Sequence, residues 1–355
     1  MTKKTKSDQI TDSKIIGGVF ALDWDLTVLT GNNPCFSFMK NVKLLLANAR
    51  SCFFSIIELL SPKFVWLPSY ICAALLEPIH AAQIDYGFYE IDEKLKIKTL
   101  CWVEAIKPQD LVVIIDYFGF PVNHQVIEQA KSNGAWIVQD KSQALLTDVI
   151  HPQTDFVIYS PRKFIPIPDG GILVAKNELD FSTLNLSSAP GEWWLKSFYT
   201  LVYRRDFDFG ASDSRTWFEL FQASEINMPM GFYSMSSFSL SLLEHGFNYS
   251  TIKNRRRENY QYLAKDLKNI ALYPSLPDAV VPLGFPIKLA NRDQVRTRLF
   301  EAEIYPPIHW PLENVVPLDF KESHALSQQI MTLPVDQRYD QADMDRILKI
   351  VVENF

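Results

Sequence analysis

Residues 135–176 read AWIVQDKSQALLTDVIHPQTDFVIYSPRKFIPIPDGGILVAK, and this stretch decides the fold class. It contains three apolar runs separated by turn-forming residues, at 135–140, 155–160 and 170–176. Such runs are typical of strands buried on both faces of a sheet. The strand-like LVVIID (111–116) and the helix-like VIEQAKSNG (126–134) precede them. Strands alternating with helices predict an α/β protein with a mainly parallel sheet flanked by helices.

The same alternation continues toward the N-terminus. The spacing of apolar residues predicts a helix over 52–60, a strand over 64–67, a helix over 71–82 and a strand over 83–91. Residues 178–230 are irregular in pattern and rich in aromatic residues. They form either an excursion that packs on a partner subunit or a satellite core within one chain. Residues 234–270 are helical in pattern.

The length of 355 residues suggests about two domains. We expect an N-terminal tail or arm over 1–30, a large domain that holds the site over 31–245, and a smaller α/β domain over 246–355. The start of the chain lacks an apolar segment behind its basic residues, so we expect a disordered tail over 1–14 and no signal peptide.

Composition narrows the classes of function. Hydrophobic residues make up 47% and charged residues 21%, which is ordinary for a globular protein. The net charge of −6 argues against nucleic acid as a partner, and Arg255–Arg257 is interpreted as a solvated helix face. No apolar run approaches the about 20 residues of a membrane span. Cys35, Cys52, Cys72 and Cys101 form no C-x-x-C pair, so we expect no metal site, a packed Cys52 and a reduced, cytoplasmic setting.

Polar residues follow the predicted strands where ligands bind in such sheets, beyond the carboxyl ends. Asp140 ends one run, Ser160 ends the next, and Lys163 lies in the turn that follows. Each also has an ordinary interpretation. Asp140 can cap a helix begun by Lys141-Ser142, Lys163 can be a solvated surface residue, and Ser160 can be a turn residue. Their order and spacing together favour a site for one planar cofactor.

Pyridoxal phosphate (PLP) needs three groups from a protein. A lysine amine bonds to its aldehyde, a carboxylate keeps its ring nitrogen protonated, and hydroxyls with a helix N-terminus hold its phosphate. Lys163, Asp140 and Ser160 match these roles. Arg50-Ser51 stands where a helix is predicted to begin, so its backbone amides would also point at an anion.

The chain resembles the DegT/StrS family of PLP-dependent sugar aminotransferases, which have the fold type I aminotransferase architecture. The resemblance covers about residues 42–350. It rests on ordered segments: LANARSCFFSII (46–57), FVWLPSYICAALLEPI (64–79), VIIDYFGFP (113–121), IVQDKSQALL (137–146), YSPRKFIPIPDGG (159–171) and NRRRENYQYLAKDL (254–267).

The resemblance implies roles for individual residues. Asp140 would pair with the ring nitrogen, Gln143 would approach the ring hydroxyl, and Ser160 with Arg50-Ser51 would bind the phosphate. Lys163 would carry the cofactor covalently. Cys72 stands where many members place an aromatic ring over the cofactor, and His309, in IYPPIHWP, would touch the acceptor sugar or serve only as a loop residue.

The sequence also departs from the family pattern. Only Pro161 and Arg162 separate Ser160 from Lys163, fewer residues than is usual. The glycine turn reads Pro-Asp-Gly-Gly at 168–171, where the family prefers Gly-Glu-Gly-Gly. The asparagine that reaches the phosphate of the partner subunit is not evident in GFYSMSS (231–237).

The resemblance implies a homodimeric aminotransferase that moves an amino group from glutamate to a nucleotide-linked keto-sugar, most commonly for bacterial surface polysaccharides. Two alternatives stay open: a non-transaminating PLP enzyme and a degenerate PLP-binding homologue that regulates or scaffolds. Sugar dehydratases of the family replace the lysine with histidine, which Lys163 argues against. No G-x-G-x-x-G after a strand and no P-loop supports a dinucleotide or nucleotide enzyme.

Overall fold

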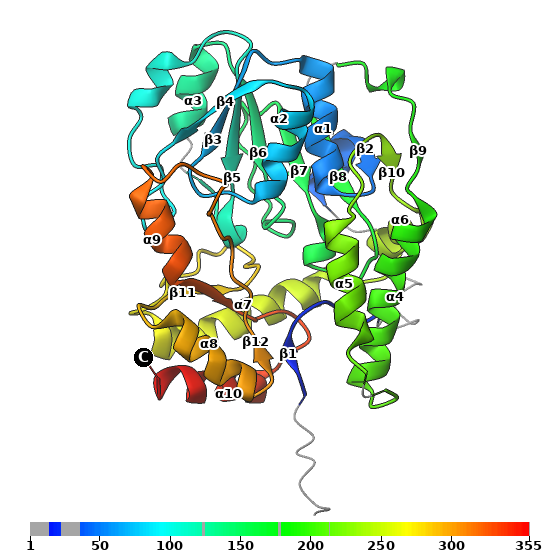
Figure 1. Cartoon of the computed structure of the whole chain (residues 1–355), viewed down its shortest axis with the longest axis vertical. Coiled ribbons are helices and arrows are strands. Elements are labelled where there is room, and N and C mark those ends of the chain that lie inside the picture. Colours follow the sequence, from blue (N-terminus) through cyan, green and yellow to red (C-terminus); the bar gives the residue numbers. More distant parts are fainter. Residues whose placement is uncertain (1–13, 23–35, 123–124, 177–178, 213, 355) are drawn as a thin grey trace, which may run out of the picture.

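The computed structural model describes residues 14–22, 36–122, 125–176, 179–212 and 214–354. The expected tail up to residue 13 and Cys35 therefore lie outside the described residues. Figure 1 shows a sheet-containing body, a smaller group of helices and short strands below it, and a helical hairpin at one side. None of the described helices is long and apolar enough to cross a membrane.

Nine strands form the central sheet. Their order is β4 (Asp85–Tyr89), β3 (Phe64–Pro68), β5 (Leu111–Ile115), β6 (Trp136–Asp140), β7 (Phe156–Tyr159), β8 (Gly171–Ala175), β2 (Val42–Leu46), β10 (Tyr233–Ser234) and β9 (Ser187–Ser188). Strands β4, β3, β5, β6 and β7 are parallel to their neighbours in this run. The predicted α/β class with a mainly parallel sheet is confirmed.

Strand β8 runs antiparallel to both β7 and β2. The reason lies in its connection: the loop from β7 to β8 contains one short 3-10 helix, Pro161–Lys163, and no crossover helix. A parallel pair needs a crossover of a dozen or more residues, so a loop of this length returns the chain antiparallel. The loop holding Lys163 is thus clamped between two adjacent central strands.

Six helices belong to the sheet-containing body: α1 (Ala49–Leu60), α2 (Leu76–Ala81), α3 (Gln125–Ser132), α4 (Gly191–Asp208), α5 (Thr216–Ile226) and α6 (Ser237–His245). Helix α1 packs on β2, β7 and β8, and α3 packs on β6. All five residues of β5 are buried, as expected of a strand covered on both faces. Cys52 on α1 is fully buried, as predicted.

The expectation that residues 178–230 are irregular is wrong, because α4 and α5 form a helical hairpin. On α4, Trp193 and Leu201 are buried, whereas Leu195 and Tyr199 are exposed. Apolar residues of α4 lie on both its buried and its exposed sides, so the sequence shows no polar face with the period of a helix. Leu201 joins an apolar cluster with residues of the Lys163 loop.

The second group of elements contains α7 (Tyr249–Leu267), β11 (Phe285–Lys288), α8 (Arg292–Glu301), β12 (Ile304–Tyr305), α9 (Lys321–Gln329), β13 (Ile330–Leu333) and α10 (Gln341–Val352). Strands β11 and β13 pair antiparallel, and β1 (Ile16–Gly17) pairs in parallel with β12. The N-terminal segment therefore packs on the C-terminal part of the chain (Figure 1). We propose that the two domains meet at the turn between α6 and α7.

Candidate functional site

Lys163 and Asp140 lie just beyond or at the carboxyl ends of the neighbouring strands β6 and β7. Asp140 is the last residue of β6, and Lys163 ends the 3-10 helix that follows β7. Burial raises the pKa of the Asp140 carboxyl, while hydrogen bonding by Ser142 and the positive charge of Lys163 act in the opposite direction. The two side chains therefore lie within electrostatic reach of each other. Lys163 itself is exposed in the isolated chain.

The local structure at Asp140 differs from the helix-capping alternative. No helix begins at Lys141-Ser142, and residues 141–150 form turns and extended segments. The Ser142 N–H donates to Asp140 Oδ1 at 2.8 Å, so one oxygen closes a turn. The Ser142 side chain also hydrogen-bonds to the Asp140 carboxylate, so residue 142 holds this carboxylate through both its backbone and its side chain.

Gln143, three residues after Asp140, is buried, and only the oxygen of its side-chain amide has a hydrogen-bond partner among the described residues. Its Oε1 accepts a hydrogen bond of 2.8 Å from the backbone N–H of Phe118, in the 3-10 helix after β5. Its Nε2 is buried and has no hydrogen-bond partner among the described residues. Because a buried donor without a partner is costly, this amide group is a candidate contact for a bound oxygen.

The N-terminus of α1 forms the second half of the candidate site. Asn48 is the N-cap, and its Oδ1 accepts from the Ser51 N–H at 2.9 Å. Arg50 pairs with Glu77 at 2.7 Å, while its Nε is buried and lacks a partner among the described residues. The carbonyl of Pro229 accepts from Asn48 Nδ2 at 2.8 Å, so the segment before β10 also lies at this helix end.

The Gly170-Gly171 turn joins the lysine loop to this helix end. The Gly170 N–H donates to the carbonyl of Ala47 at 2.7 Å. A Cβ atom on Gly171 would lie 2.3 Å from the carbonyl oxygen of Asn48, so only glycine fits at this close approach. The turn thereby brings the end of the lysine loop against the start of α1.

Asp169 anchors the same turn from the other side. Its buried carboxylate accepts hydrogen bonds from the indole of Trp194 on α4, from the backbone and hydroxyl of Ser236, and from the hydroxyl of Ser239 on α6. The carboxylate therefore ties α4 and α6 to the loop that holds Lys163. The sequence pattern gave Asp169 no role beyond a tight turn.

His309 comes to the site from the C-terminal part of the chain. Burial, and secondarily the charge of Lys163, lower the pKa of His309 to about 3, so the imidazole is neutral at physiological pH. Its Nδ1 lies 3.1 Å from Thr332 Oγ1, and its ring packs edge-on against Phe118. The Tyr70 hydroxyl donates to the His309 carbonyl, which joins the loop after β3 to the segment after β12.

The remaining predicted residues lie nearby in the fold. Ser160 is buried at the end of β7, directly before the 3-10 helix of Lys163. Cys72 is half-buried in the loop after β3, two residues beyond the buried Tyr70. The aromatic side chains recorded around this loop are those of Tyr70, Tyr117 and Trp310, with ring centroids 5.7–6.3 Å apart for the pairs that involve Trp310.

Arg256 is a residue that the sequence pattern misplaced. The expectation of a solvated face for Arg255–Arg257 is wrong at its centre, because Arg256 is fully buried. Its guanidinium donates to the carbonyls of Pro282, Leu283 and Phe164. Phe164 directly follows Lys163, so α7 holds the lysine loop beside Lys163. A signal for this role was available in the spacing of the buried residues of α7, on whose face Arg256 lies, and not in the run of arginines.

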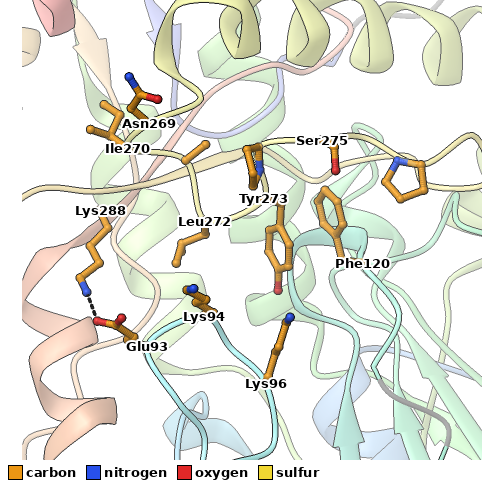
Figure 2. Close-up of a pocket in the computed structure, with 13 residues that line it drawn as sticks. Glu93, Lys94, Lys96, Phe120, Asn269, Ile270, Leu272, Tyr273, Ser275 and Lys288 are labelled. Carbon is orange, nitrogen blue, oxygen red and sulfur yellow. Dashed lines mark hydrogen bonds and ion pairs between the residues drawn. The ribbon is translucent and has the colours of Figure 1, made fainter.

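One cavity lined by described residues lies away from these groups. Its volume is about 500 Å³, and it opens between the loop after β4 and the segment before β11 (Figure 2). Stacked rings of Phe120 and Tyr273 form one wall, and Lys288 pairs with Glu93 at its rim. None of the predicted site residues lines it.

The fold is the fold type I architecture, and solved structures of aminotransferases share it. Three solved structures illustrate the likeness. A DegT/DnrJ/EryC1/StrS aminotransferase from Brucella abortus is 16% identical, with a TM-score of 0.59, and covers 89% of each chain. The sugar aminotransferase CalS13 from Micromonospora echinospora is 15% identical, with a TM-score of 0.63, and the match covers 97% of this chain and 94% of that one.

Spr1654 from Streptococcus pneumoniae, solved in its PLP form, is 15% identical with a TM-score of 0.65, and the match covers 94% of this chain and 91% of that one. At these identities the likeness is one of fold. No family model and no curated protein matches the sequence.

Proposed function

We propose that this chain is a PLP-dependent aminotransferase whose acceptor is a keto-sugar. The observation that carries the proposal is the position of Asp140 and Lys163 at the ends of neighbouring strands, close enough for the charge of Lys163 to lower the pKa of Asp140. The fold supports it, since structures of that fold include a named sugar aminotransferase and a PLP form.

Three features of the chain fit PLP. The buried Nε2 of Gln143 lacks an acceptor, which a ring oxygen would supply. The buried Nε of Arg50 lacks an acceptor, which a phosphate would supply. Burial raises the pKa of Asp140, so a protonated ring nitrogen beside it would provide the positive charge that favours its ionised form.

The roles follow from these positions. Lys163 would hold PLP through its amine, Asp140 would keep the ring nitrogen protonated, and Gln143 would donate to the ring oxygen. Bound PLP would supply an aldehyde and an electron-accepting ring. The Nζ of Lys163, once released by the amino donor, would carry the proton that leaves the donor's α-carbon.

The phosphate end would lie at the start of α1. The hydroxyl of Ser160, the backbone around Ser51 and the side chain of Arg50 would bind it, with the helix N-terminus favouring negative charge. We propose a homodimer in which a second chain covers the exposed Lys163. The position of Cys72 would place a small side chain near the ring.

The acceptor would be a nucleotide-linked keto-sugar, the donor glutamate, and the pathway that of a surface polysaccharide or related sugar. The neutral imidazole of His309, whose pKa the charge of Lys163 helps to lower, would contact the acceptor sugar. A neutral ring can donate to a sugar hydroxyl or accept from one, and it does not compete with Lys163 for protons.

A second candidate is a PLP-binding homologue without transaminase activity. The carbonyls of Met228 and Pro229 accept hydrogen bonds from Arg50 and Asn48 at the very helix end where phosphate would bind. If these bonds persist when PLP is present, the protein would bind its phosphate more weakly and transamination would be slower.

A spectroscopic titration tests the proposal. Purified protein mixed with PLP should show the visible absorption band of lysine-bound PLP, and Lys163→Ala should abolish it. Lys94→Ala, which changes an exposed lysine in the separate cavity, is the matched control and should retain the band. A band that survives in Lys163→Ala would assign the covalent bond to another lysine.

Turnover separates the two candidates. With glutamate, the wild type should convert the band in a half-reaction, and Asp140→Asn should keep the band but slow that reaction by orders of magnitude. A wild type that binds PLP and gives no conversion with any amino donor would favour the non-catalytic homologue.

A further inference from the structure

Asp116 and Lys141 form a fully buried ion pair, and Lys141 directly follows Asp140 of the candidate site. The Lys141 Nζ lies 2.8 Å from Asp116 Oδ2, and neither side chain is exposed. Asp116 follows the last residue of β5, and Lys141 follows the last residue of β6. Neither residue has a part in the chemistry proposed above, so this pair needs its own explanation.

The same carboxylate binds a second side chain of β6. Gln139 Nε2 donates to Asp116 Oδ2 at 2.9 Å. In addition, the Asp116 N–H donates to the carbonyl of Asp140 at 3.0 Å. Asp116 thus contacts three consecutive residues, 139, 140 and 141, at the end of one strand.

Strand geometry explains why these contacts matter for Asp140. Successive side chains of a strand point to opposite faces, so Gln139 and Lys141 share one face and Asp140 projects from the other. Both side chains that flank Asp140 are therefore held on the far face by one carboxylate. The backbone carbonyl of Asp140 is held as well, which fixes the point from which its carboxylate projects.

The far ends of the two flanking side chains are also held. Lys141 Nζ donates to the carbonyl of Val149 at 2.9 Å, and Gln139 Oε1 accepts from the hydroxyl of Thr154 at 3.2 Å. The Lys141 N–H donates to the carbonyl of Ile158 on β7 at 2.8 Å. The brace therefore links β5, β6 and β7 at the edge from which the site residues project.

We propose that Asp116 is a positioning residue: through Gln139 and Lys141, it holds the Asp140 carboxylate in place against the ring nitrogen of the cofactor. The importance of that position rests on the function proposed above. The positioning itself does not, because every contact is within the chain. A displacement of about 1 Å at a reacting group can reduce a rate about 100-fold, so such a brace has a functional purpose.

The test uses the double variant Asp116→Asn/Lys141→Met. A single change would leave one unpaired buried charge and is expected to fold poorly, whereas the double change removes both charges together. The matched control is Lys131→Met/Asp155→Asn. That pair has the same chemistry, with Lys131 Nζ 2.8 Å from Asp155 Oδ2, and Asp155 accepts from the N–H of Ile137 at the opposite end of β6.

Two measurements are made on both double variants. In crystal structures of the protein without cofactor, the Asp140 carboxylate should move by about 1 Å in Asp116→Asn/Lys141→Met and stay in place in the control. In the holoenzyme, the pKa of the lysine-bound PLP band should shift by about one unit toward that of Asp140→Asn, because the ring nitrogen loses its partner. Both variants should lose thermal stability.

The outcomes are distinguishable. If Asp140 and the band are unchanged in Asp116→Asn/Lys141→Met, the pair is only structural and the proposal is overturned. If Asp140 moves while the wild type forms no PLP band, the positioning role stands and the proposed function fails. If the control variant shifts the band equally, the effect belongs to general loosening of β6, and the proposal is likewise overturned.

Discussion

Replacing Asp169 with asparagine is expected to destabilise the chain, although the two side chains are nearly identical in shape. The carboxylate receives two donors that cannot turn away: the indole N–H of Trp194 on Oδ1 at 3.1 Å and the backbone N–H of Ser236 on Oδ2 at 2.7 Å. Asparagine has one oxygen. Whichever way its amide is oriented, one of these N–H groups faces an NH₂ group.

The magnitude follows from that count. The hydroxyls of Ser236 and Ser239 can rotate to accept from the new NH₂, so they need not lose a bond. One buried N–H is left without a partner, which costs about 2 kcal/mol, within a range of about 1–3. With an unfolding entropy of about 2.1 cal/mol/K per residue, 355 residues translate this into a fall in Tm of about 3 °C.

Urea unfolding at neutral pH, followed by calorimetry, measures both quantities. The control is Asp278→Asn, an identical substitution at a fully exposed carboxylate, which should change the free energy of unfolding by less than about 0.5 kcal/mol. An Asp169→Asn variant as stable as this control would refute the reasoning. It would mean that the turn relaxes to satisfy both donors with one oxygen.

Further changes test other contacts. Gly171→Ala should destabilise strongly or prevent folding, because its Cβ would lie 2.3 Å from the carbonyl oxygen of Asn48; Gly191→Ala, with open space around its Cβ, should be neutral or slightly stabilising in the same thermal assay. Burial raises the pKa of Asp336, but Arg338 outweighs it and holds the folded pKa below the ordinary value. Asp336→Asn should therefore lower the free energy of unfolding by its full amount above about pH 4, and this loss should shrink as the pH falls through the folded pKa of Asp336. Urea unfolding at several pH values measures the loss, and a pH-independent loss would contradict the expectation.

The central sheet was predictable because its buried strands consist almost entirely of apolar residues. The run 111–116 is apolar at nearly every position, and the structure buries all of β5. The run 135–140 likewise gives β6 to within one residue. The direction of β8 was less accessible, because direction depends on the length of the β7–β8 loop and not on the composition of the strand.

Helices were predictable only where one face is polar. On α3, buried Val126, Ile127 and Ala130 alternate with polar residues, so the period shows in the sequence. On α4, aromatic and aliphatic residues occupy both the buried and the exposed sides, so composition conceals the helix. Arg256 shows the converse, because a run of charged residues predicts exposure and yet this residue is buried. Its guanidinium donates to carbonyls of segments that are distant in the sequence, which the run itself does not reveal.

The same distinction explains which parts of the candidate site the sequence reveals. Asp140 and Lys163 each end a segment whose type is evident, and the rule that strand ends meet at one edge brings them together without knowledge of other residues. Asp116 and Asp169 differ, because their roles depend on partners far along the chain, such as Lys141 or Trp194, whose approach only the folded structure shows. A carboxylate proposed to contact a ligand can thus be predicted from its place at a strand end, whereas one proposed to position another residue becomes evident only from its contacts.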